Sequence, residues 1–147
     1  MNSDPTSGVA RPQVYTIEDN PADVRLVEEG IDAAGTEIDL QVINNGRRAI
    51  DQLTGVETDE RHPDLVLLDL NLPDKSGFEV LTAIRAETAF REVPVVVVSS
   101  SDNSADIKQA YDAAANAYVM KPADPDKYIQ MVDSVVDFWI TNTTYDR

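Results

Sequence analysis

The residues of this chain that suggest chemistry are carboxylates placed directly after apolar runs. Leu65 to Leu68 reads LVLL and leads into Asp69, and the shorter run Val14 to Ile17 leads into Glu18 and Asp19. An unpaired buried charge is costly, so an acid at the end of such a run needs a partner or a function. In open α/β sheets, ligands bind at the carboxyl ends of the strands. These three acids are therefore the first candidates for a site.

Two more polar residues follow apolar runs in the same way. Ser99 comes after the β-branched run Val95 to Val98, and Lys121 comes after Met120. If all the strands are parallel, these residues meet the three acids at one edge of the sheet. Carboxylates supply the oxygen ligands that Mg²⁺ prefers, and a hydroxyl and an ammonium can hold phosphoryl oxygens. The set predicts phosphoryl transfer onto a carboxylate, with Asp69 as the nucleophile.

The elements that must position these residues follow from the hydrophobic pattern. Five short apolar runs predict strands. Each of them is followed by a segment with helical periodicity, and the last such segment begins after Pro122. The strands are expected at 14–17, 37–43, 65–70, 95–98 and 118–120. Alternation of strands with helices is the pattern of a parallel α/β sheet.

Helix ends and buried faces can be predicted as well. The first helix should follow Asn20-Pro21 and end at Gly35, and a capping box from Ser76 to Glu79 should open the third. For the fourth helix we expect Asp102 or Ser104 as the cap, and a buried stripe made by Ile107, Ala110, Tyr111 and Ala114. The last helix should begin near Pro125 and turn inward Ile129, Val132, Val136 and Trp139.

Composition excludes several classes of function. The net charge is −15, from 27 acidic against 12 basic residues, which disfavours nucleic-acid binding because phosphate contacts need clustered Lys and Arg. The chain has no cysteine and no apolar run long enough for a membrane, so we expect a cytoplasmic protein that does not bind membranes. The acid-rich surface is similar to that of proteins from salt-loving organisms, and a halophilic archaeal source is expected. The single histidine, His62, is expected to be solvated in a loop.

Together, these motifs resemble the receiver domain of two-component response regulators, the CheY-like family. The resemblance rests on Glu18-Asp19-Asn20-Pro21, LVLLDLNLP with Gly77 behind it, Ser99 after the valine strand, and Lys121-Pro122. It covers about 13–140 and implies a doubly wound, five-stranded parallel sheet of order 2-1-3-4-5 with five helices on both faces. A stand-alone receiver domain is expected over 13–141, with a disordered leader at 1–12 and a flexible tail at 142–147.

The resemblance also implies roles at the site. Asp69 would be the phosphoacceptor, and Asp19 and Asp69 would bind Mg²⁺ or Mn²⁺ directly. Asn71 would contribute its backbone carbonyl to the metal, and Glu18 would act through a water. Ser99 would donate a hydrogen bond to the phosphoryl group, and Lys121 would pair with it.

Other residues would shape or transmit the response. Tyr118 occupies the aromatic switch position, and its ring would turn inward when Ser99 moves toward the phosphate. Pro73 and Gly77 would shape the loop behind the acceptor, and Pro122 would follow Lys121 through a peptide bond that is usually cis in this family. Asn71 and Ser101 occupy positions that tune dephosphorylation in receivers.

The implied partners are a sensor histidine kinase or phosphotransfer protein and a separate downstream effector, met through residues 102–115, 117–120 and 125–140. A homodimer through the last helices is a further expectation. The protein would not be an enzyme beyond self-phosphorylation and slow autodephosphorylation. The turn from Asn20 to Asp23 resembles that of small receivers paired with phytochrome-like kinases, while chemotaxis and phosphorelay roles stay open.

Of three other functions, one stays open and two are disfavoured. A receiver-like module could bind partners without being phosphorylated. A haloacid-dehalogenase-like phosphatase would also use an aspartate after a parallel strand, but it needs a second acid where Asn71 stands. A nucleotide-binding fold is disfavoured because the first turn carries acids where a phosphate loop needs glycines or hydroxyls. Taken singly, each site residue could also be structural, such as an acid at a helix N-terminus.

Overall fold

The computed structural model describes residues 11–54, 62–87 and 90–141. In this part of the chain, five parallel strands form one sheet in the order β2-β1-β3-β4-β5, which confirms the predicted fold and strand order. The strands are β1 (Gln13–Ile17), β2 (Asp39–Ile43), β3 (Leu65–Leu68), β4 (Val95–Ser99) and β5 (Ala117–Met120). Most of the expected leader, the expected tail and the acidic segment 55–61 lie outside the described residues, so the domain limits stay a prediction.

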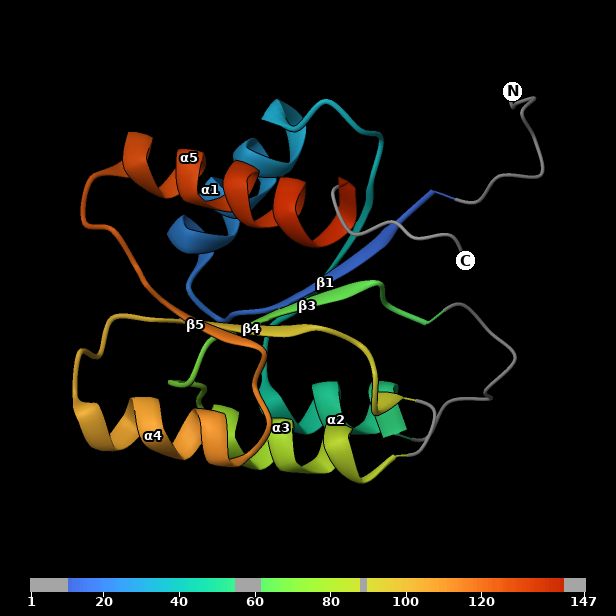
Figure 1. Ribbon diagram of the computed structural model, residues 1–147, viewed down its shortest axis with the longest axis vertical. Coiled ribbons are helices and arrows are strands. Elements are labelled where there is room, and N and C mark those ends of the chain that lie inside the picture. The colour runs from blue at the N-terminus through green and yellow to red at the C-terminus, as the bar shows by residue number, and fades with distance from the viewer. Residues whose placement is uncertain (1–10, 55–61, 88–89, 142–147) are drawn as a thin grey trace.

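Helices cover both faces of the sheet. They are α1 (Pro21–Ala33), α2 (Gly46–Thr54), α3 (Gly77–Ala86), α4 (Ser104–Asp112) and α5 (Pro125–Val136), and a π-helix, η2 (Asp137–Thr141), continues α5. Figure 1 shows α1 and α5 on one face and α2, α3 and α4 on the other. None of the helices in the described ranges combines the length and the apolar character needed to cross a bilayer.

The central strands supply both hydrophobic cores. Every residue of β3 is buried, and its side chains alternate, so that Val66 and Leu68 join one core while Leu65 and Leu67 join the other. Burial on both faces explains the continuous apolar run. The strand therefore holds its carboxyl end, and Asp69 behind it, in a rigid position.

The helix caps confirm one prediction and correct another. The side chain of Ser76 accepts a hydrogen bond from Glu79 N–H at 3.2 Å, as expected. The cap of α4 is Asn103, not Asp102 or Ser104, because its Oδ1 accepts the N–H of Ala105 at 2.7 Å. Asparagine is among the best N-cap residues, yet Asn103 was overlooked as a candidate, and local geometry decides between it and its two neighbours.

The predicted buried stripe of α4 forms only in part, because Ala110 is buried and Ile107 is half-buried but the other two residues are exposed. Tyr111 is 48% exposed, and Ala114 is exposed at the turn after the helix, with a φ of 74°. The cause is the edge strand beside the helix. The N–H of Tyr118 on β5 donates to the Tyr111 hydroxyl at 3.1 Å, which holds that ring along the sheet edge instead of beneath it.

The expectation that His62 is solvated is also wrong. Its ring packs edge-on against Phe90, with centroids 5.2 Å apart, and its Nε2 is buried without a hydrogen-bond partner in the described structure. Phe90 belongs to the core beside α2 and α3 and offers an apolar surface to the imidazole.

Candidate functional site

Strand pairing brings three acids together at the carboxyl edge of the sheet. β1 and β3 are neighbours with Ile17 opposite Leu68, so Glu18 and Asp69 leave the sheet side by side. Glu18 is 3% exposed and Asp69 is 5% exposed, whereas Asp19 is open to solvent. One carboxylate oxygen from each of the three lies within 4.8 Å of the others. The predicted cluster therefore forms.

The donor set fits a hard divalent cation. Carboxylate oxygens are the ligands that Mg²⁺ and Mn²⁺ prefer, and exposed Asp19 leaves one side of the cluster open to water. Burial, followed by the negative charge of Asp69, raises the pKa of Glu18 to about 7, although a hydrogen bond from Lys121 opposes the shift. A cation among these acids would relieve that repulsion.

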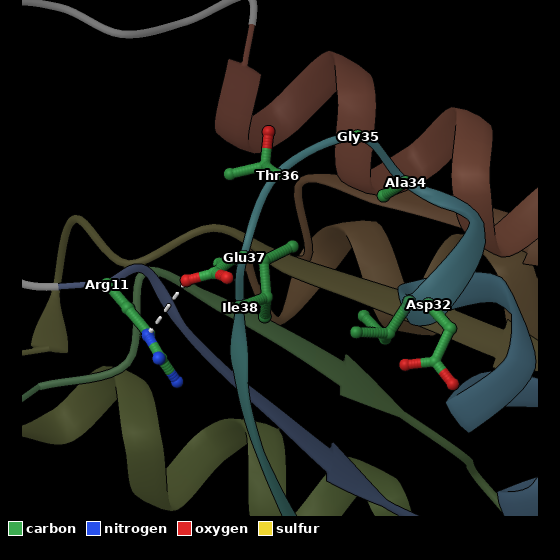
Figure 2. Close-up of a pocket in the computed structure, with 8 residues that line it drawn as sticks. Arg11, Asp32, Ala34, Gly35, Thr36, Glu37 and Ile38 are labelled. Atoms are coloured by element: carbon green, nitrogen blue, oxygen red, sulfur yellow. Dashed lines mark ion pairs between the residues drawn. The ribbon is translucent and has the colours of Figure 1, made fainter. Parts of the chain in front are cut away.

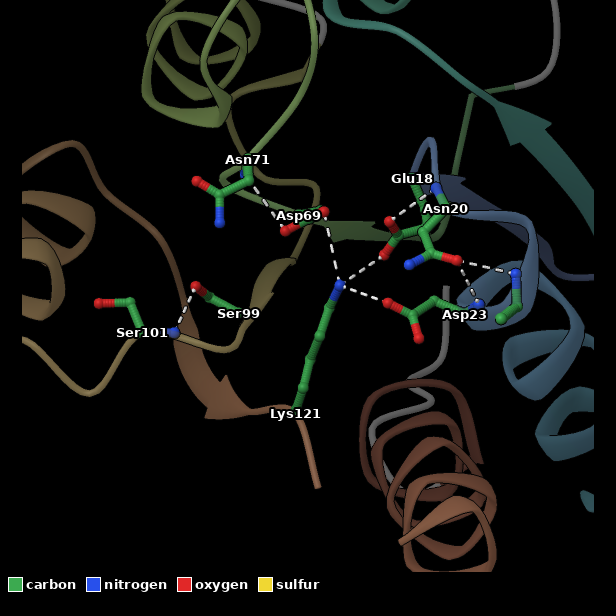
Figure 3. A network of polar contacts seen from close by, with 9 residues as sticks. Glu18, Asn20, Asp23, Asp69, Asn71, Ser99, Ser101 and Lys121 are labelled. Atoms are coloured by element: carbon green, nitrogen blue, oxygen red, sulfur yellow. Dashed lines mark hydrogen bonds and ion pairs between the residues drawn. The ribbon is translucent and has the colours of Figure 1, made fainter. Parts of the chain in front are cut away.

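Lys121 reaches across the edge to the acids from the end of β5. Its Nζ lies 2.9 Å from Glu18 Oε1, 2.7 Å from Asp23 Oδ2 and 3.5 Å from Asp69 Oδ2 (Figure 3). Burial opposes the charge, but hydrogen bonds to Asp23 and Glu18 hold the pKa of Lys121 above its usual value. The side chain is therefore a fixed ammonium at the acid cluster.

The Lys121-Pro122 peptide bond is trans, whereas the resemblance implied only that this bond is usually cis in such proteins and left its isomer here open. The trans isomer is the lower in energy for X-Pro bonds by about 0.5–1 kcal/mol. In this form the backbone N–H of Lys121 donates to Ser99 O at 2.8 Å, and its side chain still reaches the acids.

Asp23 is a site residue that sequence reasoning missed. It was considered only as part of the turn after β1, yet it makes the shortest contact to Lys121. The available signal was its place in the first turn of a helix that starts at the site edge, where a side chain can point back toward the strand ends.

Ser99 and Asn71 lie near the acceptor and bond to neighbouring backbone groups. Ser99 is fully buried, and its Oγ accepts the N–H of Ser101 at 3.1 Å. The N–H of Asn71 donates to Asp69 Oδ1 at 3.2 Å (Figure 3). Ser99 therefore stands at the expected strand end, with its hydroxyl oriented by the loop that follows.

That loop also links Tyr118 to α4. The Tyr118 hydroxyl donates to Ser101 O at 2.9 Å, and the Ser101 hydroxyl donates to Asp106 Oδ2 at 2.8 Å. Ser101 thus contacts three groups: the hydroxyl of Ser99, the hydroxyl of Tyr118, which is the expected switch residue, and Asp106 in the first turn of α4. The part played by Asp106 was not foreseen.

Gly77 supports the acceptor from behind. A Cβ at this position would lie 2.5 Å from Asp69 O and 2.6 Å from the Cα of Leu70, both of them backbone atoms. The N–H of Gly77 donates to Leu70 O at 2.9 Å. Only glycine allows α3 to begin this close to the strand end. Pro73 lies exposed in the same connection.

A hollow of about 320 Å³ lies elsewhere, beside the turn after α1 (Figure 2). Arg11 and Glu37 line it and form an ion pair at 3.4 Å. Because these residues precede β1 and β2, the hollow sits at the amino ends of the strands and is separate from the acid cluster.

Comparison with known proteins finds relatives that match most of this chain in sequence. Response regulator Rcp1 of Synechocystis sp. is 33% identical over 133 residues, which cover 89% of this chain and 90% of that protein. The probable methanogenesis regulatory protein FilR2 of Methanothrix harundinacea is 31% identical over 128 residues, 86% of this chain and 83% of that protein. These relatives give no support to a halophilic origin, which stays a prediction.

Solved structures agree with the fold in detail. The phosphorylated cyanobacterial phytochrome response regulator RcpA is similar with a TM-score of 0.86 and 35% identity, over 92% of this chain and 98% of that one. The Mn²⁺-bound form of Rcp1 has a TM-score of 0.84 and 31% identity, over 92% and 99% of the two chains. The acid triad here is of the kind typical of receiver metal sites.

One family description accounts for most of the sequence. The sequence model of the response regulator receiver domain matches residues 14–133, which include all of β1 but its first residue, the other four strands and most of α5. With the parallel sheet, the acid triad and the lysine at its edge, this match makes the chain a member of the response regulator receiver domain family.

Proposed function

We propose that this chain is a response regulator that accepts a phosphoryl group on Asp69 from a sensor histidine kinase or a phosphotransfer protein. Receiver domains are typically phosphoacceptors rather than enzymes, and they partner histidine kinases. They are usually cytoplasmic, and we propose the same location here. The observation that carries the proposal is the buried Asp69 carboxylate at the end of β3, with the Lys121 ammonium 3.5 Å from its Oδ2.

In the proposed reaction, a carboxylate oxygen of Asp69 attacks the phosphorus atom of the donor. The new P–O bond forms as the P–N bond of a phosphohistidine breaks, and the imidazole nitrogen keeps the electron pair. A bound Mg²⁺ or Mn²⁺ would offset the negative charge that gathers on the acids and the phosphoryl oxygens. Asp19 and Asp69 would hold it directly, Asn71 through its carbonyl, and Glu18 through a water.

The phosphoryl oxygens then compete for the polar groups around them. Lys121 would turn from its carboxylate partners toward the new charge, and Ser99 would donate its hydroxyl proton to a phosphoryl oxygen. Ser99 Oγ now accepts the N–H of Ser101, and Ser101 O accepts the Tyr118 hydroxyl. A movement of Ser99 therefore disturbs the anchor of Tyr118, which supports its role as the switch.

The proposed output surface is the face made by α4, β5 and α5. Tyr111 is 48% exposed and Met120 is 42% exposed on this face, so apolar side chains are available to an effector protein or to a second copy of the chain. A nearly complete two-state switch needs about 5.5 kcal/mol of differential stabilisation. A charge-assisted hydrogen bond supplies about 1.5–3 kcal/mol, and any new bond from Lys121 replaces one that it already makes to Glu18 or Asp23. The net gain therefore falls short of that figure, and we propose that partner binding completes the change.

Intact mass measurement tests the proposal. The protein is incubated with Mg²⁺ and acetyl phosphate beside Asp69→Asn and beside Asp102→Asn, an exposed acid on the same edge. The parent and Asp102→Asn should gain one phosphoryl group, and Asp69→Asn should gain none. Equal gain in Asp69→Asn would overturn the proposal. No gain in the parent would favour a module that binds partners without phosphorylation.

A further inference from the structure

The shortest contact of Lys121 is to a residue with no assigned part in the phosphoryl chemistry. Its Nζ lies 2.7 Å from Asp23 Oδ2 but 3.5 Å from Asp69 Oδ2. Its hydrogen bonds go to Asp23 and Glu18. The ammonium therefore lies closer to α1 than to Asp69, the residue proposed to carry the phosphoryl group.

Asp23 is a firm anchor for this ammonium. It lies in the first turn of α1, where Asn20 accepts the N–H groups of Ala22 and Asp23 and where Pro21 occupies the start of the helix. A carboxylate in this position is stabilised by the helix dipole. The Asp23 and Lys121 side chains are 20% and 12% exposed, so solvent and salt screen the pair only weakly.

We propose that Asp23 is a positioning residue that competes with the phosphoryl group for the Lys121 ammonium, and thereby limits how tightly the phosphorylated site is held. The inference rests on the proposed function, because it takes Asp69 as the acceptor. A lysine ammonium is a single compact charge, and its strongest hydrogen bonds cannot serve Asp23 and a phosphoryl oxygen equally. The free energy lost when the contact to Asp23 weakens therefore offsets part of the attraction between Lys121 and the phosphoryl group.

Glu18 cannot replace Asp23 in this competition. Glu18 belongs to the acid triad that fits a divalent cation, whereas Asp23 lies outside that triad. With a cation among the acids, Asp23 stays free to hold Lys121. A phosphoryl group on Asp69 therefore has to displace Asp23 from the Lys121 ammonium.

The test measures affinity for beryllofluoride, a phosphoryl analogue that binds aspartate without a lasting covalent change, in the presence of Mg²⁺. Asp23→Asn keeps the shape of the side chain and removes its charge. It should bind beryllofluoride about tenfold more tightly than the parent, and the acyl phosphate should persist correspondingly longer. Asp23→Glu, which restores the carboxylate, should return both quantities toward the parent values.

A matched control and a double-mutant cycle separate competition from a general field effect. Asp32→Asn removes one exposed charge from the other end of the same helix and should behave like the parent. In a Lys121→Ala background, Asp23→Asn should have almost no effect, because the ammonium through which it acts is gone. An undiminished effect in that background would show a simple loss of negative charge and would overturn the inference.

The Lys121 side-chain ammonium signal in NMR gives a readout on the metal-free protein that does not depend on phosphorylation. It should shift in Asp23→Asn and stay unchanged in Asp32→Asn. If the parent binds beryllofluoride and Lys121→Ala weakens binding, while Asp23→Asn binds no more tightly than the parent, the inference fails and the proposed function stands. If the parent neither binds beryllofluoride nor gains a phosphoryl group, both fail.

Discussion

Removing the charge of Glu18 should change how the stability of the metal-free protein depends on pH. Burial and the nearby Asp69 raise the pKa of Glu18 from 4.5 to about 7 in the folded protein. The ionised carboxylate therefore destabilises the folded state above pH 7, and this penalty is relieved as the pH falls from 7 toward 4.5. Stability should rise, not fall, as the solution is made mildly acidic.

The size of the effect follows from linkage between proton binding and folding. A difference of this size between the folded and unfolded pKa corresponds to roughly 3 kcal/mol over the full range. Between pH 8 and pH 6 only part of it is realised, and we expect the free energy of unfolding to rise by roughly 1 kcal/mol. Glu18→Gln cannot titrate at position 18, so the variant should lack this rise over the same interval.

Urea unfolding in EDTA at pH 8, 7 and 6, monitored by circular dichroism, gives the free energy of unfolding of both proteins. His62, the one histidine, is common to the parent and Glu18→Gln, so its contribution cancels in the comparison. Excess Mg²⁺ should flatten the pH profile of the parent, because cation binding offsets the repulsion between the acids. A parent that gains no stability relative to Glu18→Gln from pH 8 to pH 6 would refute the reasoning.

Three other changes test contacts that hold the site or the sheet in place. Gly77→Ala should cost about 1–3 kcal/mol in thermal unfolding, because its Cβ would meet backbone atoms, whereas Gly35→Ala, which has no atom within 4 Å, should cost much less. Arg85→Lys should lower the free energy of unfolding in urea by about 2 kcal/mol, because Arg85 donates to five oxygen acceptors near the amino ends of β4 and β5 and lysine cannot reproduce that fork. Tyr118→Phe should cost about 1 kcal/mol and shift the NMR signal of the Ser101 amide, since the hydroxyl bond to Ser101 O is lost; an unchanged signal would argue against that link.

The sheet and the acid cluster were predictable because each depends on a strong local signal. The apolar runs before Asp69 and Ser99 are too hydrophobic for surface strands, and both are fully buried. Once those strands are parallel, their carboxyl ends must share an edge. Glu18 and Asp69 then meet through strand pairing alone, without any information about side-chain packing.

The remaining details depend on differences too small or too distant to be read locally. Asn103, and not its neighbours, caps α4, because adjacent cap residues differ by only a fraction of a kcal/mol. Tyr111 stays exposed because an edge-strand N–H takes its hydroxyl, which becomes evident only when α4 and β5 are placed side by side. The Asp23–Lys121 contact joins residues 98 positions apart and depends on how α1 is set against the end of β5.

The position of the phosphoryl group tests the central claim most directly. The protein is phosphorylated with acetyl phosphate and Mg²⁺, reduced with borohydride, which converts an aspartyl phosphate to homoserine, and then sequenced by peptide mass spectrometry. We predict homoserine at position 69 and at no other aspartate, and only in samples that received both the donor and Mg²⁺. Homoserine at Asp19 or Asp23, or an unmodified Asp69 in a protein that carries a phosphoryl group, would contradict the account.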